Sequence, residues 1–481
     1  MQLSKFTFLT LAFCLLLFSC SKSQTPPQTP PVPTPPVIIN YGDIQVWLTE
    51  ANKSALFSEQ KNVQFNNLNN QLPSIVVDST QKFQEIDGFG FCLTDGSAHL
   101  INTMSDLDKN TLLQELFSTN GNSIGISYIR VSIGASDLSQ NVYSYDDLPD
   151  GQTDTLLTRF NIDKNRVDLI PVLKIILQIN PNIKILGSPW SAPSWMKDNN
   201  GTKGGSLQKK YYDVYANYFV KYIQAMKAEG ISIDAITPQN EPLNPDNNPS
   251  MYMTASDQAY FIKNSLGPAF SKFNITTKII CYDHNADVPQ YPLTVLQDAD
   301  IRKYVDGSAF HLYAGNISAL SQVHNRFPDK NIYFTEQYTP SSGSFGGDLS
   351  WHIQNLIIGA TKNWSKNVLE WNLASDPALG PHTDGGCTTC LGAVTIDGNK
   401  VTRNQSYYII AHASKLVRPG SYRIQSSNIP GFSNVSFLTP DGRKILIVIN
   451  NGSQRQQFNI KFNGKTATTS LNGGAVATYF W

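Results

Sequence analysis

Short runs of hydrophobic and β-branched residues alternate with longer amphipathic stretches between residues 86 and 400. Each short run is typical of a buried strand, and each longer stretch repeats its apolar residues at helical spacing. The predicted strands are Ile86–Leu93, Ile126–Ile133, Ile183–Trp190, Ile233–Pro238, Lys278–Asp283, Gly307–Tyr313, Asn331–Thr335 and Val368–Asn372. Helices are predicted in most of the gaps, at Lys109–Phe117, Arg166–Ile179, Leu207–Glu229, Ser256–Phe270, Ile317–Phe327 and Leu349–Trp364. This α/β alternation predicts a (β/α)8 TIM barrel over residues 86–400.

The two ends of the predicted domains have a different pattern, in which short strands alternate apolar and polar residues. Residues 43–85 contain two such strands, Ile44–Leu48 and Ser74–Val77. Residues 401–481 contain four more, separated by Asp-Gly, Asn-Gly and Gly-Gly turns, at Val435–Leu438, Lys444–Asn450, Gln457–Phe462 and Ala475–Trp481. The strands of 43–85 are too few to form a domain alone. We therefore expect one β-sandwich domain built from both chain ends.

The first 42 residues are expected to serve export rather than the fold. Residues 1–20 have the features of a signal peptide: a positive Lys5, the apolar stretch Phe6–Phe18, and the sequence Leu17-Phe18-Ser19-Cys20. That tetrapeptide resembles a bacterial lipobox, so Cys20 is the predicted lipidation site; ordinary signal cleavage nearby is the alternative. Residues 21–42 are predicted to be a proline-rich tether. We expect an exported protein, lipid-anchored at the bacterial cell envelope on the outer membrane or periplasmic face.

Charge and cysteine content narrow the classes of function. Lysine plus arginine number 37 and aspartate plus glutamate 37, so no excess of positive charge is available to bind nucleic acid. Four cysteines, too few for a disulfide scaffold, lie in the predicted domains, at Cys92, Cys281, Cys387 and Cys390. The last two follow His382 and Asp384, which makes a metal site conceivable, but a local disulfide or free thiols are favoured. No metal and no cofactor are expected.

Polar and aromatic residues stand at nearly every predicted strand end, where a barrel forms its active site. Glu241 follows the fourth strand and Glu336 the seventh, which places two carboxylates across the barrel mouth. A single strand-end glutamate is more often an ion-pair partner or a solvated residue, but glycoside cleavage needs such a facing pair. We assign Glu241, beside Asn240, as the acid/base and Glu336 as the nucleophile. The substrate-binding candidates are Asp95, Arg130, Trp190, Asn240, His284, His311, Tyr313, Trp371 and Asn372.

Several of these candidates have a structural alternative. Asp95, Arg130 and Asp283 could form a buried ion-pair cluster, and for Arg130 orienting a carboxylate is as well supported as plain pairing. Trp190 and Trp371 could be core residues, although their strand-end positions favour sugar platforms. The two histidines, His284 and His311, are interpreted as binding residues rather than proton carriers.

Ordered motifs across residues 43–481 resemble glycoside hydrolase family 30, which contains glucosylceramidase-like enzymes, bacterial β-1,6-glucanases and some β-xylosidases and xylanases. They include Gln84–Gly90, Thr94–Ala98, Arg130–Asp137, Ser188–Lys197, Pro238–Pro242, Phe334–Gln337 and Lys415–Gly420. The resemblance implies a barrel joined to a β-sandwich and retention through a glycosyl-enzyme, with Glu241 and Glu336 in the roles assigned above. It also implies that Asp95, Trp190, Asn240, His311, Tyr313 and Trp371 line a glucose-sized subsite.

Within the family, residues 351–359, 371–374 and 380–387 are more similar to the β-1,6-glucanase branch. The function predicted is therefore an endo-β-1,6-glucanase acting on β-glucan by double displacement. A glucosylceramidase-like exo-β-glucosidase or a β-xylosidase is the alternative, and a non-catalytic carbohydrate-binding lipoprotein ranks below both. Phe91-Cys92 and Leu312 depart from the usual family residues, so the subsite walls can differ. The loops after strands seven and eight are expected to decide between endo and exo action.

Overall fold

A computed structural model describes residues 43–67 and 69–481 of the chain. The predicted signal peptide, Cys20 and the tether lie outside the described residues, so their prediction stands as it was made. Within the part that the structure describes, no helix has both the length and the apolar character needed to cross a membrane.

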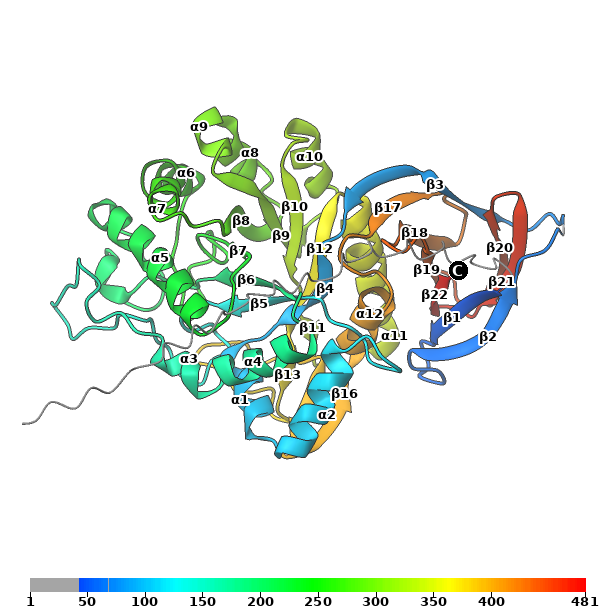
Figure 1. Cartoon of the computed structure of the whole chain (residues 1–481), viewed down its shortest axis with the longest axis horizontal. Helices are drawn as coiled ribbons and strands as arrows, with labels where there is room; N and C mark the ends of the chain where they lie inside the picture. The colour runs from blue at the N-terminus through cyan, green and yellow to red at the C-terminus, as the bar shows by residue number, and fades with distance from the viewer. Residues whose placement is uncertain (1–42, 68) are drawn as a thin grey trace, which may run out of the picture. The chain divides into compact units, whose positions relative to one another are not determined.

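Eight parallel strands form the closed barrel that the sequence predicts. They are β4 (Gly88–Cys92), β5 (Tyr128–Ser132), β6 (Lys184–Ser188), β7 (Ala235–Ile236), β8 (Lys278–Ala286), β9 (Val305–Gly315), β10 (Asn331–Glu336) and β12 (Ser365–Asn372). Figure 1 shows them running from blue β4 to yellow β12 with helices outside. Seven strands each contribute one buried side chain to a packed layer in the barrel interior, namely Tyr128, Leu186, Ala235, Ile280, Ala309, Tyr333 and Leu369. The barrel is therefore filled below its mouth, as expected for this fold.

The helices occupy every gap between consecutive barrel strands. They are α1 (Asp95–Thr103), α2 (Asp106–Phe117), α3 (Asp163–Val167), α4 (Leu169–Ile179), α5 (Tyr212–Ala228), α6 (Ala255–Phe261), π-helical η3 (Ile262–Leu266), α7 (Gly267–Lys272), α8 (Gln290–Gln297), α9 (Ala299–Arg302), α10 (Ala319–Arg326), α11 (Phe345–His352) and π-helical η4 (Ile353–Ala360). The sequence prediction missed α1, α8 and α9. Both α8 and α9 are shorter than three turns, so their apolar spacing gives little periodic signal.

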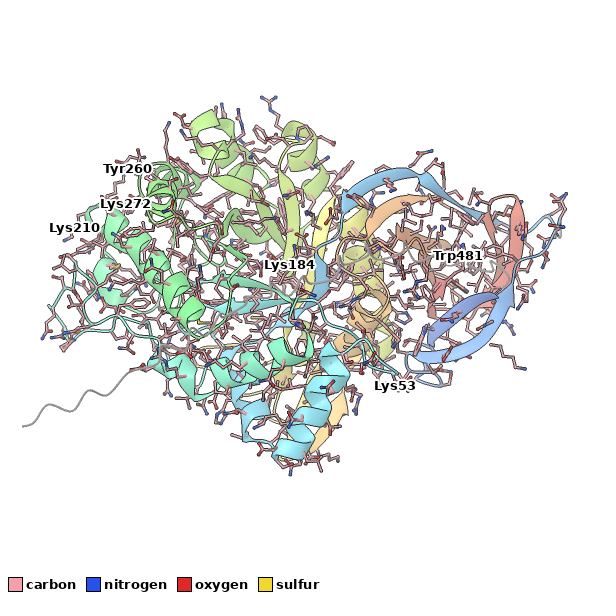
Figure 2. All side chains as sticks on the ribbon, viewed as in Figure 1. Lys53, Lys184, Lys210, Tyr260, Lys272 and Trp481 are labelled. Carbon is pink, nitrogen blue, oxygen red and sulfur yellow. A yellow bond between two sulfur atoms is a disulfide. The ribbon has the colours of Figure 1, made fainter. Side chains whose placement is uncertain are left out.

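The second sheet joins both chain ends, as predicted. Its order is β2-β1-β22-β19-β18-β17-β3-β20-β21. The strands are β1 (Asp43–Thr49), β2 (Ser58–Gln64), β3 (Ser74–Glu85), β17 (Tyr422–Ser426), β18 (Phe432–Leu438), β19 (Lys444–Asn450), β20 (Gln456–Phe462), β21 (Lys465–Leu471) and β22 (Val476–Phe480). Long β3 pairs antiparallel with β17 and parallel with β20. The sheet thereby encloses its own apolar core, which includes the final residue Trp481, labelled in Figure 2.

Helix α12 (Gln405–Ser414) connects the two domains and was not predicted. All of its residues from Ser406 to Ser414 are buried, so it lacks the polar face that identifies a helix in sequence. The imidazole of His412, in this helix, is hydrogen-bonded through Nδ1 to the Thr478 hydroxyl of β22 (2.9 Å) and through Nε2 to the Thr49 hydroxyl of β1 (2.8 Å). Burial lowers the pKa of His412 to about 3, so the imidazole is neutral in the fold.

Candidate active site

The two predicted catalytic glutamates meet at the barrel mouth. Glu336 is the last residue of β10, and Glu241 lies five residues beyond β7. Both side chains are buried, and one oxygen of each carboxylate lies within 4.8 Å of the other. A separation of about 5 to 5.5 Å is typical of retaining glycosidases, whereas inverting enzymes need about 6.5 to 9.5 Å. The geometry is therefore that of a retaining pair.

The backbone that carries Glu241 is held in an unfavourable conformation. Glu241 has a φ of 43°, and Tyr282 and Asp283 on the neighbouring strand have φ values of 74° and 70°. Left-handed backbone at a non-glycine residue costs roughly 1–3 kcal/mol and persists only where its surroundings impose it. Here the Glu241 amide donates to the Asp283 carbonyl at 2.9 Å. This hydrogen bond fixes the direction in which the Glu241 side chain leaves the barrel rim.

Arg130 of β5 is fully buried and connects both sides of the site. Its Nη1 donates to Glu336 Oε2 at 2.5 Å, and its Nη2 donates to Asn240 at 2.6 Å and to Asp283 Oδ2 at 2.8 Å. The guanidinium also lies 4.8 Å from the ring centre of Trp190. Arg130 thus orients a carboxylate and takes part in a buried ion pair, so both interpretations of this residue apply. Asn240 accepts the hydrogen bond from Arg130 with its side-chain amide oxygen.

His311 of β9 lies between the glutamates and a buried acid. Its Nδ1 is 3.1 Å from Glu241 Oε1 and 3.7 Å from Glu336 Oε1. Its Nε2 is 3.1 Å from Asp283 Oδ1. Asp283 accepts further hydrogen bonds from three hydroxyls, those of Ser188, Thr237 and Thr335. Together with Arg130, these donors hold the pKa of Asp283 well below its ordinary range despite burial.

The charges around His311 decide where a proton is held. Burial alone would lower the pKa of His311, but Glu336, Asp283 and Glu241 raise it to about 9. Burial would raise the pKa of Glu241, yet the hydrogen bond and the charge of His311 outweigh it and lower that pKa to about 2. Burial raises the pKa of Glu336 above its ordinary value, while the charges of His311 and Arg130 oppose the rise. His311 therefore holds the proton that it shares with Glu241.

A cavity of about 460 Å³ opens above the two glutamates. Trp190 and Trp371 form one wall, with ring centres 5.3 Å apart. On the other side Tyr313 donates its hydroxyl to Glu336 Oε1 at 3.0 Å and packs on Tyr338. His284 also lines the cavity, and its Nδ1 accepts a hydrogen bond from the Leu243 amide. An aromatic wall beside two carboxylates suits a sugar ring, which has apolar faces and polar edges.

Four of the nine predicted binding residues line this cavity, namely Trp190, His284, Tyr313 and Trp371. Arg130, Asn240 and His311 do not line it but belong to the hydrogen-bond network of the glutamates, whereas Asp95 and Asn372 do neither. Asp95 begins α1 and lines a separate cavity, where it accepts hydrogen bonds from Ser139 (2.8 Å) and Tyr143 (2.7 Å). It is also not part of the Arg130–Asp283 ion pair. The Asn372 amide lies behind Trp371 and donates to the Ala374 and Cys390 carbonyls, both at 3.4 Å. Neither residue lines the cavity, and their role in binding the sugar stays a prediction.

Asp137 is the acid that takes the place expected for Asp95. It lines the cavity, is 6% exposed, and has a pKa that burial and the charges of Glu336 and Glu241 raise to about 7. The signal was present in the sequence, because Asp137 closes the motif that starts at Arg130. The loop after β7 was missed as well and adds lining residues, namely Leu243, Asn244, Pro245, Asp246 and Asn247.

The predicted alternatives for Cys387 and Cys390 are distinguished by the structure. A disulfide joins Cys387 to Cys390, so neither offers a thiolate ligand, while Cys92 and Cys281 are free and buried. Among the described residues, one group of three acidic or histidine side chains presents converging ligand atoms: Glu241, His311 and Glu336. The hydrogen bond of His311 to Glu241 and its ion pair with Glu336 account for this proximity.

The fold and the paired glutamates define a glycoside hydrolase of the retaining type. A model of the glycosyl hydrolase family 30 TIM-barrel domain matches residues 86–417, and a model of the family 30 β-sandwich domain matches residues 420–479. The chain belongs to glycosyl hydrolase family 30. The first model includes α12, which therefore belongs with the barrel.

Three similar proteins illustrate the range of the family. An endo-1,6-β-D-glucanase of Aspergillus fumigatus is 39% identical over 394 residues, which cover 76% of this chain and 78% of the relative. A putative glucosylceramidase of Caenorhabditis elegans is 31% identical, covering 78% of this chain and 76% of the relative. A solved structure of an endo-β1,6-glucanase superimposes with a TM-score of 0.85 at 34% identity, covering 92% of this chain and 99% of that one.

Proposed function

We propose that this enzyme is an endo-β-1,6-glucanase that cleaves β-1,6-linked glucan by double displacement. The observation that carries the mechanism is the pair Glu241 and Glu336, whose oxygens lie within 4.8 Å at the floor of an aromatic-walled cavity. The linkage is supported by the endo-1,6-β-glucanases among the similar proteins, which are more identical to this chain than the glucosylceramidase is.

In the first step the Glu336 carboxylate attacks the anomeric carbon and forms an ester bond to the sugar. Arg130 and Tyr313 each donate a hydrogen bond to this carboxylate and so favour its ionised, correctly oriented form. Glu241 gives its proton to the departing glycosidic oxygen as the bond to the anomeric carbon breaks. In the second step Glu241 takes a proton from water, whose oxygen displaces Glu336 from the sugar.

The proton for the first step comes from the pair His311 and Glu241. Across their 3.1 Å contact the proton can reside on His311 Nδ1 or on Glu241 Oε1. The Nε2–H stays with Asp283, so His311 remains in a fixed orientation in either state. When a sugar enters and displaces water, the neutral pair is favoured over two buried charges, and the proton moves to Glu241. The pair thus supplies a general acid although His311 lowers the pKa of Glu241.

The test is product release from a β-1,6-glucan and, in parallel, from glucosylceramide and an aryl β-glucoside. Wild type is compared with Glu336→Gln, which keeps the shape and removes the nucleophile. We expect oligosaccharides from the glucan with wild type and a loss of at least about 10⁴-fold in the variant. Release from glucosylceramide or the aryl glucoside alone would reassign the enzyme as an exo-acting glucosidase. Undiminished activity of the variant would refute the mechanism.

We also propose that the enzyme is exported and held at the bacterial cell envelope by a lipid on Cys20. The proposal rests on the leader and tether residues described in the sequence analysis. The lipid anchor is the only membrane contact that we propose. The test is detergent partitioning of the expressed protein and of Cys20→Ser. Wild type should enter the detergent phase and the variant the aqueous phase; equal partitioning would refute the anchor.

A further inference from the structure

The turn Cys387-Thr388-Thr389-Cys390 lies beside the cavity, and its first and last residues contribute to the cavity wall. We name these four residues the disulfide turn, because a disulfide joins its first residue to its last. Both cysteines line the cavity that holds the catalytic glutamates. Neither catalytic step uses them, so their position at the sugar site needs another explanation.

The far end of the disulfide turn is fastened to the segment that follows the nucleophile. Cys390 lies in β14 (Cys390–Leu391), which pairs antiparallel with β11 (Thr339–Pro340). The Ser341 amide also donates to the Thr389 carbonyl at 2.9 Å. Since β11 begins three residues after Glu336, the turn has a fixed position relative to the nucleophile strand.

Cys390 also packs with the aromatic wall. It is 4% exposed and belongs to one buried apolar cluster with Trp190, Trp371, Leu138 and Cys92, and the partly buried Cys387 packs against this cluster. Leu138 is the neighbour of Asp137 in the chain. The turn therefore contacts both the tryptophans of the cavity and the loop that carries its acidic residue.

The near end of the disulfide turn reaches Asp137 itself. A hydrogen bond from the Cys387 backbone opposes the rise in the pKa of the Asp137 carboxyl. Just before the turn, Thr383 donates its amide (2.9 Å) and its hydroxyl (3.2 Å) to the Asp137 carbonyl. The approach at Gly386 is so close that an added Cβ would lie 2.2 Å from the Asp137 carbonyl oxygen. Residues 383–387 thus hold the backbone around Asp137 in place through hydrogen bonds and close packing.

We propose that the Cys387–Cys390 disulfide is a positioning element for Asp137, holding its carboxyl at the place where it binds a sugar hydroxyl. The inference rests on the proposed function, because it takes the cavity to be the sugar site. Without the cross-link the turn samples more conformations, and the Cys387 amide is no longer directed at Asp137. A four-residue loop gains little stability from closure, so the disulfide acts on the site rather than on the fold.

The experiment is a double-mutant cycle on the full chain. Cys387→Ser/Cys390→Ser is made in the wild-type background and in Asp137→Asn, and kcat and KM are measured on the β-1,6-glucan. Loss of a hydrogen bond to a charged group predicts a fall in kcat/KM of about 10- to 100-fold in the wild-type background. In the Asp137→Asn background the same change should lower kcat/KM by less than about 3-fold, because the carboxylate that the disulfide positions is already absent. Equal losses in both backgrounds, or no loss in wild type, would overturn the proposal.

Two controls separate positioning from general damage. Thr388→Ala alters an exposed residue of the same turn and keeps the disulfide, so its kcat/KM should stay within about 2-fold of wild type. A phosphine reductant, which converts the disulfide to two thiols as the phosphine becomes its oxide, should lower wild-type activity and leave the serine variant unchanged. A reductant effect of the same size on the serine variant would contradict the assignment.

Amide hydrogen exchange tests the inference without any substrate. Loss of the disulfide should speed exchange within residues 133–145 and 376–391 while the rest of the barrel stays protected. If wild type cleaves no β-glucoside but this change occurs, the proposed function fails and the positioning stands. If exchange in residues 133–145 is unchanged, the positioning fails whatever the substrate is.

Discussion

Replacing His311 by glutamine should make the activity strongly dependent on pH rather than uniformly low. In wild type the pair His311 and Glu241 loses its shared proton with a pKa of about 9, and activity falls as the pH rises through that value. In His311→Gln the proton is held by Glu241 alone. Without the imidazolium, the pKa of Glu241 returns from about 2 to above its ordinary 4.5, because burial then raises it.

The size of the effect follows from these pKa values. His311 contributes most of the stabilisation that lowers the pKa of Glu241 to about 2, which amounts to on the order of 3 kcal/mol for the ionised carboxylate. The alkaline limb of kcat/KM should move from about pH 9 to between about pH 5 and 6. At pH 8 the protonated fraction is then about 100- to 1000-fold smaller than in wild type, whereas at pH 5 it falls by at most about 2-fold.

The assay is the pH profile of kcat/KM from pH 4 to about 10 on the β-1,6-glucan, for wild type, His311→Gln and His284→Gln. His284 lines the same cavity but accepts its hydrogen bond from the Leu243 amide, so His284→Gln should keep an alkaline limb near pH 9. Parallel profiles for wild type and His311→Gln, separated by a constant factor, would show that His311 is merely structural and would refute the shared proton.

Three further changes test the fold and its pH dependence. Arg130→Met should lower the free energy of unfolding by about 3–5 kcal/mol in urea, because it removes the buried counter-charge that Asp283 and Glu336 share; a change below about 1 kcal/mol would contradict this. Since the folded pKa of His412 lies near 3, wild type should lose about 5 kcal/mol of stability as the pH falls from 6.5 to 3, and His412→Gln should flatten that slope. Trp481→Ala should cost about 3–5 kcal/mol by calorimetry, whereas Trp351→Ala, at a residue 40% exposed, should cost much less; equal losses would count against the second core.

The sequence predicts the barrel because each strand is a short apolar run that ends in polar chemistry. It also predicts the meeting of Glu241 and Glu336, since parallel strands bring their carboxyl ends to one rim. Motifs place residues in order along the chain but do not show which way a side chain points. Asp95 and Asp137 both stand just beyond strands, and only the path of the loop after β5 shows that Asp137 reaches the cavity.

Other features lie beyond sequence reasoning for physical reasons. The proton held by His311 depends on distances to three carboxylates from different strands, which no local pattern contains. The buried helix α12 has no amphipathic period, so its sequence pattern does not distinguish it from the strands around it. The disulfide turn is compatible in sequence with a thiol pair, a metal site or a bridge, and the structure has the bridge.

The pairing of β3 with β17 and β20 sets an order of events during synthesis. Strands β1 to β3 are made before the barrel, and β1 and β2 can pair with each other at once. The strands that pair with β3 and with the other edge of β1 follow only after the 336 residues between Glu85 and Tyr422. At about 5–20 residues per second, these early strands wait roughly 20 to 70 s for their partners. All eight barrel strands are made within that interval. The catalytic domain can therefore assemble while the sandwich is still open, and the last residues of the chain, ending in Trp481, close it.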